Sequence, residues 1–181
     1  LVGLVREAAP LPKRASIRVR HGDAREVLGR LPAGMHGAMD LVIVDIFAGS
    51  RTPAHVSSAE FYGLIRPLLA PGGVVVVNAT DGAGQAFTRG QAATLASIFP
   101  EVAAIAEPQV LKGRRFGNVV LVASNEEPGI DWLPRLLAGG PHPARMLAGR
   151  ELEEWLRGAR PVTDATAAPS PEPPKELFGD G

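Results

Sequence analysis

The feature that most limits how this chain can fold is a pair of short runs of apolar residues, most of them β-branched. One is Leu41-Val-Ile-Val44, flanked by Asp40 and Asp45, and the other is Val74-Val-Val-Val77. A strand with one face in water alternates apolar and polar residues, whereas a strand that is apolar on both faces is typical of a parallel sheet covered by helices. The two runs therefore predict two buried strands of an α/β domain.

Helical and strand patterns alternate along much of the chain. We expect helices at residues 1–8, 24–31, 57–69, 84–99, 131–138 and 150–158, and further strands at 17–20, 102–106 and 119–123. This alternation indicates a doubly wound sheet, in which ligands bind at the carboxyl ends of the strands. Candidate ligand-binding residues are therefore sought at 22–24, 45–48 and 78–84.

Composition excludes several classes of function. The 181 residues include 19 Lys+Arg and 19 Asp+Glu, so the chain has no basic surplus with which to bind nucleic acid. It has no cysteine, and its four histidines lack the spacing of metal ligands, so no metal is expected. No apolar run approaches the length of a membrane span.

The last part of the chain differs in composition from the rest. From about residue 161 it is rich in Pro, Ala and Ser, and it includes Pro169-Ser-Pro-Glu-Pro-Pro174. Such a segment lacks the apolar periodicity that a core requires. We therefore expect one folded domain over 1–160 and a disordered tail over 161–181.

Asp45 is the first candidate catalytic residue. It follows four apolar residues at the end of a predicted strand and precedes a long loop. A carboxylate partly shielded from water at such a place is suited to accept a proton. Capping of the loop backbone is an equally good interpretation of its position.

Two further stretches carry candidate binding residues. Asp23 precedes a predicted helix, so the local sequence favours an N-cap, but its carboxylate could instead accept a hydrogen bond from an exocyclic amine such as that of adenine. The second stretch, Gly82-x-Gly84, imitates part of a dinucleotide fingerprint. Because Phe87 stands where the third glycine is required, we interpret it as a loop.

Four blocks of sequence are more specific together than any one alone. They are Arg18-Val-Arg-His-Gly-Asp-Ala-Arg25, Asp40-Leu-Val-Ile-Val-Asp45, Ser57-Ser-Ala-Glu-Phe-Tyr62 and Leu69-Ala-Pro-Gly-Gly-Val74. In this order they resemble the polyamine aminopropyltransferase (spermidine synthase) family, especially spermidine-synthase-like proteins of high-GC bacteria. The resemblance covers roughly residues 1–124. It implies a Rossmann-like, class I S-adenosylmethionine-dependent methyltransferase-type fold with a mostly parallel sheet.

The resemblance also implies an activity. Members of the family transfer an aminopropyl group from decarboxylated S-adenosylmethionine to an amine such as putrescine, without a metal, and a cytoplasmic location is expected. Asp23 and the backbone of Ala24 would hold the adenine, and Asp45 would be the base that removes a proton from the attacking amine. The second acceptor-binding aspartate of the family is absent, because Ile46-Phe47-Ala48 occupies that stretch. Asp81 is the substitute that we consider for substrate binding.

Other departures concern the start of the fold and the end of the second apolar run. The Gly-rich loop and the acidic residue that hold the cofactor in this family are not found ahead of Gly22-Asp23-Ala24, and Asn78-Ala-Thr80 differs from the usual Gln-containing stretch. We therefore expect an enzyme fold that lacks its N-terminal strands, leaves Leu41–Val44 at an open sheet edge, and is inactive alone. Two alternatives stay open: an S-adenosylmethionine-dependent methyltransferase, and a non-catalytic interaction domain. In the second alternative the open edge would form a homo-oligomer.

Overall fold

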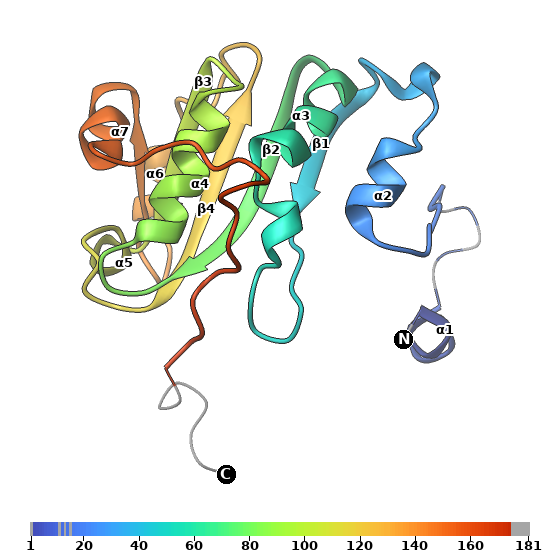
Figure 1. Ribbon diagram of the computed structural model, residues 1–181, viewed down its shortest axis with the longest axis horizontal. Helices are drawn as coiled ribbons and strands as arrows, with labels where there is room; N and C mark the ends of the chain where they lie inside the picture. The colour runs from blue at the N-terminus through green and yellow to red at the C-terminus, as the bar shows by residue number, and fades with distance from the viewer. Residues whose placement is uncertain (1, 11, 13, 15, 175–181) are drawn as a thin grey trace.

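The computed structural model describes residues 2–10, 12, 14 and 16–174, which form one five-stranded sheet with helices around it (Figure 1). The strands are β1 (Met39–Val44), β2 (Leu69–Asp81), β3 (Glu101–Ala106), β4 (Gly117–Ser124) and β5 (Arg145–Ala148), in the spatial order β1-β2-β4-β3-β5. The helices are α1 (Val2–Ala8), α2 (Ala24–Gly29), α3 (Ala59–Ile65), α4 (Ala86–Ala96), α5 (Pro108–Leu111), α6 (Leu133–Ala138) and α7 (Gly149–Leu156), and the 3-10 turns are η1 (Ala33–Met35), η2 (Ala54–Val56) and η3 (Arg66–Leu68).

The two apolar runs lie side by side as parallel strands. Leu41 pairs with Val74 and Val44 pairs with Val77. The other three strand pairs are antiparallel, so the described sheet is mixed rather than mostly parallel. The β3–β4 connection explains part of this difference. It holds only the short helix α5, whereas a parallel return needs a crossover of about a dozen residues or more.

The core lies between one face of the sheet and helices α3, α4 and α7 (Figure 1). Its largest fully buried side chains include Tyr62, Phe61, Phe99, Ile65, Leu95 and Leu121. The buried Tyr62 hydroxyl donates to Gln91 Oε1 at 2.7 Å, and Gln91 Nε2 donates to the Ser57 carbonyl at 2.9 Å. Burial raises the pKa of Tyr62, so its phenol stays neutral. The Tyr62–Gln91 hydrogen bond connects α3 to α4.

The start of β2 depends on close backbone contact with β1. The register shifts between Met39 and Leu41, and Pro71-Gly-Gly73 forms an irregularity within β2 rather than a separate turn. A Cβ atom on Gly73 would lie 2.6 Å from the Met39 carbonyl oxygen, so the approach of the two strands requires glycine at this position.

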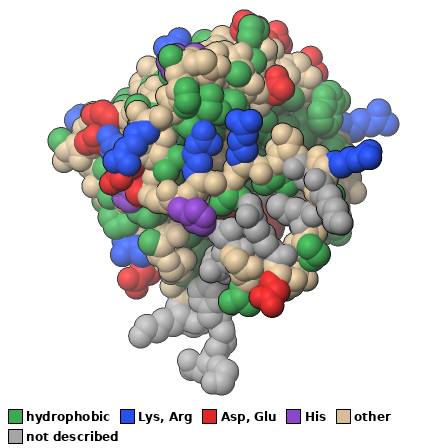
Figure 2. Space-filling model, turned by 90° about the vertical axis from the view of Figure 1, so that its right-hand side faces the viewer, with side chains coloured by type: hydrophobic (Ala, Val, Ile, Leu, Met, Phe, Trp, Pro, Cys, Tyr) green, Lys and Arg blue, Asp and Glu red, His purple; other side chains and the backbone are tan. Residues whose placement is uncertain are grey.

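The β1 side of the sheet is less covered than the rest. Among the described residues β1 pairs with β2 alone, and its side chains Leu41 and Ile43 are 53% and 65% exposed. Figure 2 views the molecule from the side of α2, where apolar side chains lie at the surface among Lys and Arg side chains. The strand predicted at 17–20 does not form, because no described segment is hydrogen-bonded to it as a neighbouring strand.

The C-terminal segment 159–174, which we call the strap, runs across the helices in an ordered course (Figure 1). Val162 lies between α3 and α4: its carbonyl accepts from Ala59 N at 2.8 Å and its N–H donates to Thr94 Oγ1 at 2.8 Å. Farther along, the fully buried Ser170 exchanges hydrogen bonds with the backbone of Thr52.

The strap corrects the expectation of a disordered tail for residues 161–174, whereas residues 175–181 lie outside the described part. The strap is held by polar contacts with elements far away in the sequence. Such contacts do not produce a periodic pattern of apolar residues. None of the helices in the described residues is long and apolar enough to cross a membrane.

Candidate functional site

Asp45 and Asn78 meet at the carboxyl ends of the two parallel strands. Because Val44 pairs with Val77, the next residue of each chain segment lies at the same end of the sheet. Asn78 Nδ2 donates a hydrogen bond to Asp45 Oδ1 at 2.9 Å. Asp45 is exposed, and its second oxygen has no hydrogen-bond partner within the described residues. The Asn78 amide therefore orients the carboxylate and leaves one oxygen able to accept a proton from a bound molecule.

Buried oxygen atoms without partners lie close to this strand end. Asn78 Oδ1 and Thr52 Oγ1 have no hydrogen-bond partner, and both residues border a narrow gap beside Val44 that is too small to hold a water molecule. Thr80 Oγ1, two residues farther along β2, is also unpaired. An unsatisfied buried polar group costs about 1–3 kcal/mol, so these three oxygen atoms mark the strand end as a place where the packing is unfavourable.

Asp23 forms the N-cap that its local sequence favours. Its Oδ1 accepts from Arg25 N at 3.0 Å and from Glu26 N at 3.1 Å at the start of α2. Its Oδ2 lies 2.7 Å from His55 Nε2, and this contact together with the Glu26 N–H lowers the pKa of Asp23. The N–H of Ala24 makes no hydrogen bond within the described residues. Asp23 is thus fixed on both oxygens, while the neighbouring backbone donor is free.

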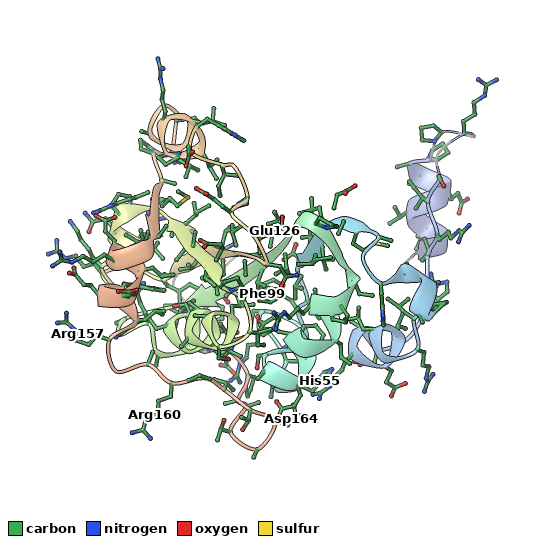
Figure 3. All side chains as sticks on the ribbon, turned by 90° about the horizontal axis from the view of Figure 1, so that it is seen from above. His55, Phe99, Glu126, Arg157, Arg160 and Asp164 are labelled. Atoms are coloured by element: carbon green, nitrogen blue, oxygen red, sulfur yellow. The ribbon has the colours of Figure 1, made fainter. Side chains whose placement is uncertain are left out.

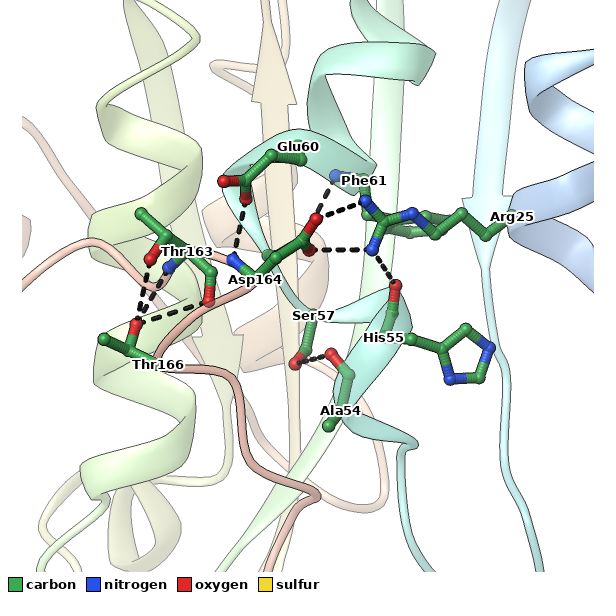
Figure 4. Close-up of polar contacts among 10 residues, drawn as sticks. Arg25, Ala54, His55, Ser57, Glu60, Phe61, Thr163, Asp164 and Thr166 are labelled. Carbon is green, nitrogen blue, oxygen red and sulfur yellow. Dashed lines mark hydrogen bonds and ion pairs between the residues drawn. The ribbon is translucent and has the colours of Figure 1, made fainter.

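His55 belongs to a polar network that connects α2, η2, α3 and the strap (Figures 3 and 4). Arg25 Nη1 donates to the His55 carbonyl at 2.9 Å, and the Arg25 guanidinium holds Asp164 of the strap through two hydrogen bonds of 2.6 and 2.7 Å. Ser58 Oγ also donates to Asp164, at 2.5 Å. Arg25 and then Ser58 lower the pKa of Asp164 to about 2, so this carboxylate is charged at neutral pH.

Asp81 is placed differently from the other aspartates. It is 5% exposed, and its Oδ1 accepts from Gly82 N at 2.8 Å. Its Oδ2 accepts from the N–H and the hydroxyl of Thr88, at 2.8 and 3.2 Å. Both oxygens therefore serve the start of α4. Asp81 also lines a hollow of about 470 Å³ between α4 and the strap, with Phe87 and Gln91.

Comparison with known proteins finds chains of similar sequence and fold. No family model matches the sequence. A stretch of 70 residues is 37% identical to a protein named probable polyamine aminopropyl transferase, from Bifidobacterium longum (strain NCC 2705), and covers 37% of this chain and 16% of that protein. The fold matches the crystal structure of a probable spermidine synthase from Corynebacterium glutamicum ATCC 13032, with a TM-score of 0.78 and 30% sequence identity. The chain is spermidine-synthase-like.

This match covers 90% of the spermidine-synthase-like chain and 59% of the Corynebacterium chain. Each match thus covers less than two thirds of the relative's own length. The likeness confirms the Rossmann-like, class I methyltransferase-type fold and the family resemblance carried by the four sequence blocks.

Sequence patterns singled out Asp23, Ala24, Asp45 and Asp81, together with the stretch 78–84 and, more weakly, His55, but they did not predict which side chain contacts which aspartate. Asn78 and His55 reach these aspartates only in the folded chain, from residues 33 and 32 positions away. The strap residue Asp164 lies 139 positions from Arg25. No local pattern marks such pairs. Within the described residues, no group of three or more His, Cys, Asp or Glu side chains is arranged to hold a metal.

Proposed function

We propose that this spermidine-synthase-like chain takes part in the transfer of an aminopropyl group from decarboxylated S-adenosylmethionine to a small amine. The observation that carries the proposal is Asp45, exposed at the carboxyl end of β1 and held through one oxygen by Asn78. The family resemblance supplies the cofactor and the type of acceptor. The position of Asp45 supports its role as the base.

In the proposed reaction, the amine nitrogen of the acceptor attacks the methylene carbon bonded to the sulfonium. A C–N bond forms as the C–S bond breaks, and the electron pair of the C–S bond stays on sulfur, which leaves as the neutral thioether methylthioadenosine. The amine must lose a proton, because an ammonium has no lone pair with which to attack. The unpaired oxygen of Asp45 receives that proton, and Asn78 holds the carboxylate in place.

The adenine of the cofactor is proposed to lie at the start of α2. The free N–H of Ala24 would donate to a ring nitrogen, and Asp23 Oδ2 would accept from the exocyclic amine. His55 now occupies that oxygen, so it would have to share the carboxylate with the adenine. Acceptor binding by Asp81 stays a prediction. It would require Thr88 or Gly82 to give up a hydrogen bond.

The test is release of methylthioadenosine from decarboxylated S-adenosylmethionine and putrescine by the natural gene product that contains this chain. Asp45→Asn should lower kcat by about 100-fold or more, since a positioned general base contributes about 10²–10⁴-fold. Asp40→Asn is the matched control, because Asp40 is an exposed aspartate at the other end of β1. Equal activity of the two variants would contradict the assignment of Asp45 as the base.

A methyltransferase is the second candidate, and one observation favours it. The segment after Asp45 is Ile46-Phe47-Ala48, in which Ile46 packs against the core and no side chain can bind a second ammonium. Assays with both S-adenosylmethionine and its decarboxylated form separate the two reactions. Methyl transfer without aminopropyl transfer would overturn the first proposal.

Self-association through β1 is a further, non-catalytic candidate. The exposed Leu41 and Ile43 and the unpaired side of β1 support it. Light scattering tests it, and a folded, strictly monomeric protein would contradict it. The cytoplasmic location implied by the resemblance stays a prediction.

A further inference from the structure

Three arginines surround a hollow of about 410 Å³ beside the start of α4. They are Arg89, on α4, and Arg157 and Arg160, on the segment that follows α7. No carboxylate of the described residues lines this hollow, and none of the three arginines forms an ion pair within them. Although the chain as a whole carries no net charge, this part of its surface is positive.

Arg89 has an incomplete set of partners. Its Nη2 donates to the Arg157 carbonyl, which connects α4 to the segment after α7. Its Nε is buried and has no hydrogen-bond acceptor. A buried donor without an acceptor is unfavourable, so Arg89 is held beside the hollow at a cost, and it is the other nitrogens of its guanidinium that can meet an anionic oxygen there. Figure 3 shows Arg157 and Arg160 on the same side of the molecule as each other.

Glycines form much of the remaining wall. Gly84, with φ 85°, and Gly158, with φ 82°, adopt left-handed backbone conformations, and Gly90 lies within α4. The missing side chain of Gly90 makes room for Val162 of the strap, whereas Gly84 and Gly158 have open space beside them and let a ligand approach the backbone closely. Gly84 is the second glycine of the Gly82-x-Gly84 turn, a motif to which the proposed transfer reaction assigns no role.

We propose that this arginine hollow, formed by Arg89, Arg157 and Arg160, binds a phosphate dianion, either free or as the phosphomonoester of a nucleotide. Guanidinium groups match phosphate oxygens in both charge and geometry, because each presents parallel N–H donors. Neither decarboxylated S-adenosylmethionine nor an amine acceptor carries a phosphate. The lining includes none of Asp23, Asp45 and Asp81, so the hollow is a site separate from the proposed reaction.

The experiment titrates the 181-residue chain with inorganic phosphate and with adenosine 5′-monophosphate at constant ionic strength. Binding is followed by calorimetry and by NMR shifts of the Gly84, Gly90 and Gly158 amides. We expect saturable binding. Arg157→Gln and Arg160→Gln should each weaken it by about tenfold, the effect of losing one charge-assisted hydrogen bond.

Arg150→Gln is the matched control. Arg150 is an exposed arginine on the neighbouring helix α7, paired with Glu154, and it does not line the hollow. The control removes the same charge nearby and should leave the affinity unchanged. Arg89→Lys tests the third arginine, because it keeps the charge but loses the planar fork of donors. The side chains of Arg157 and Arg160 make no hydrogen bond or ion pair within the described residues, so Arg157→Gln and Arg160→Gln test the site without depending on how Arg89 variants fold.

The outcomes separate the two sources of the phosphate and include two that would overturn the site. Equal affinity for both ligands identifies free phosphate as sufficient. Tighter binding of adenosine 5′-monophosphate than of inorganic phosphate, together with no binding of adenosine, identifies the ligand as a phosphomonoester. Absence of saturable binding by either ligand would overturn the proposal, as would an equal loss of affinity in Arg150→Gln and Arg157→Gln. None of these outcomes depends on whether the gene product catalyses aminopropyl transfer, so the two proposals can fail independently.

Discussion

The two flanks of β2 differ in how they are built. On one flank, β4 pairs with β2 over eight residue pairs and is itself paired with β3, and its Val122, which lies in the same row and on the same face of the sheet as Ile43, is only 8% exposed. On the other flank, β1 has no second neighbour among the described residues, and Leu41 and Ile43 are more than half exposed. Strands β4 and β1 thus have similarly apolar sequences but differ in how far their side chains are buried. An apolar β-branched run predicts a strand, but its neighbours decide whether the strand is covered.

Exposed apolar side chains follow the same division. Among the described residues, the large exposed hydrophobic side chains that precede residue 48 are Leu4, Val5, Ile17, Val19, Leu41, Ile43 and Phe47. Beyond it they are Trp132 and Leu136. The strap connects the two flanks, because it contacts α4 through Thr94, the loop after β1 through Thr52, and α2 through Arg25.

The largest expected effect compares the same substitution on both flanks. Leu121→Ala should destabilise the protein by about 3 kcal/mol, because it leaves a cavity in a fully buried site, whereas Leu41→Ala should cost less than about 1 kcal/mol. Urea unfolding of both variants measures the difference. Similar losses of stability in the two variants would show that Leu41 is covered in solution. The two flanks would then not differ in burial.

The next effect concerns the contact that joins β1 to β2. Gly73→Ala should destabilise the protein by about 2 kcal/mol or more, since the added Cβ would lie 2.6 Å from the Met39 carbonyl oxygen. Gly63→Ala is the control. Gly63 lies in α3, and its added Cβ would meet nothing within 4 Å. The control should be neutral or stabilising, because alanine favours a helix. If the two variants have equal thermal unfolding midpoints, the close contact between β1 and β2 does not require glycine at position 73.

A smaller effect tests the strap as the link between the flanks. Ser170→Ala removes the hydroxyl that accepts from Thr52 N at 2.9 Å and leaves that buried N–H unpaired. We expect a loss of about 1–2 kcal/mol and faster proteolysis within the strap. Ser97→Ala serves as the control, because Ser97 Oγ bonds only to the Thr94 carbonyl of its own helix. Unchanged proteolysis of Ser170→Ala would mean that other contacts suffice to hold the strap.

The smallest effect is a pH dependence of the same strap. Asp164 has a pKa lowered from 3.8 to about 2 in the folded protein, so its contribution to stability is present above pH 3.8 and is lost as the pH falls towards about 2. Amide protection in the strap should fall over this interval. Asp164→Asn should abolish that dependence, and a persistent transition in this variant would point to another carboxylate. Because the ion pair is exposed, added salt should weaken it.

Much of the fold follows from patterns that are visible along the chain. The apolar runs at β1 and β2, the helix α3 within the expected range 57–69, and the Asp23 cap of α2 all form where the sequence indicates. The predicted strand at 17–20 failed, because a strand also requires a hydrogen-bonded neighbour. Sequence periodicity could not predict the ordered strap, because the strap is held by individual polar contacts and not by a periodic apolar face.

By itself, the sequence determined features that depend on neighbouring residues. These are the helix cap at Asp23 and the apolar strand that ends in Asp45. Local backbone chemistry and side-chain periodicity act over a few residues, so they can be read in order along the chain. Tertiary structure alone decided that Asn78 holds Asp45, that His55 meets Asp23, and that Arg89 lies beside Arg157. Those contacts join positions far apart in the chain, and only packing of the elements brings their side chains within hydrogen-bonding distance.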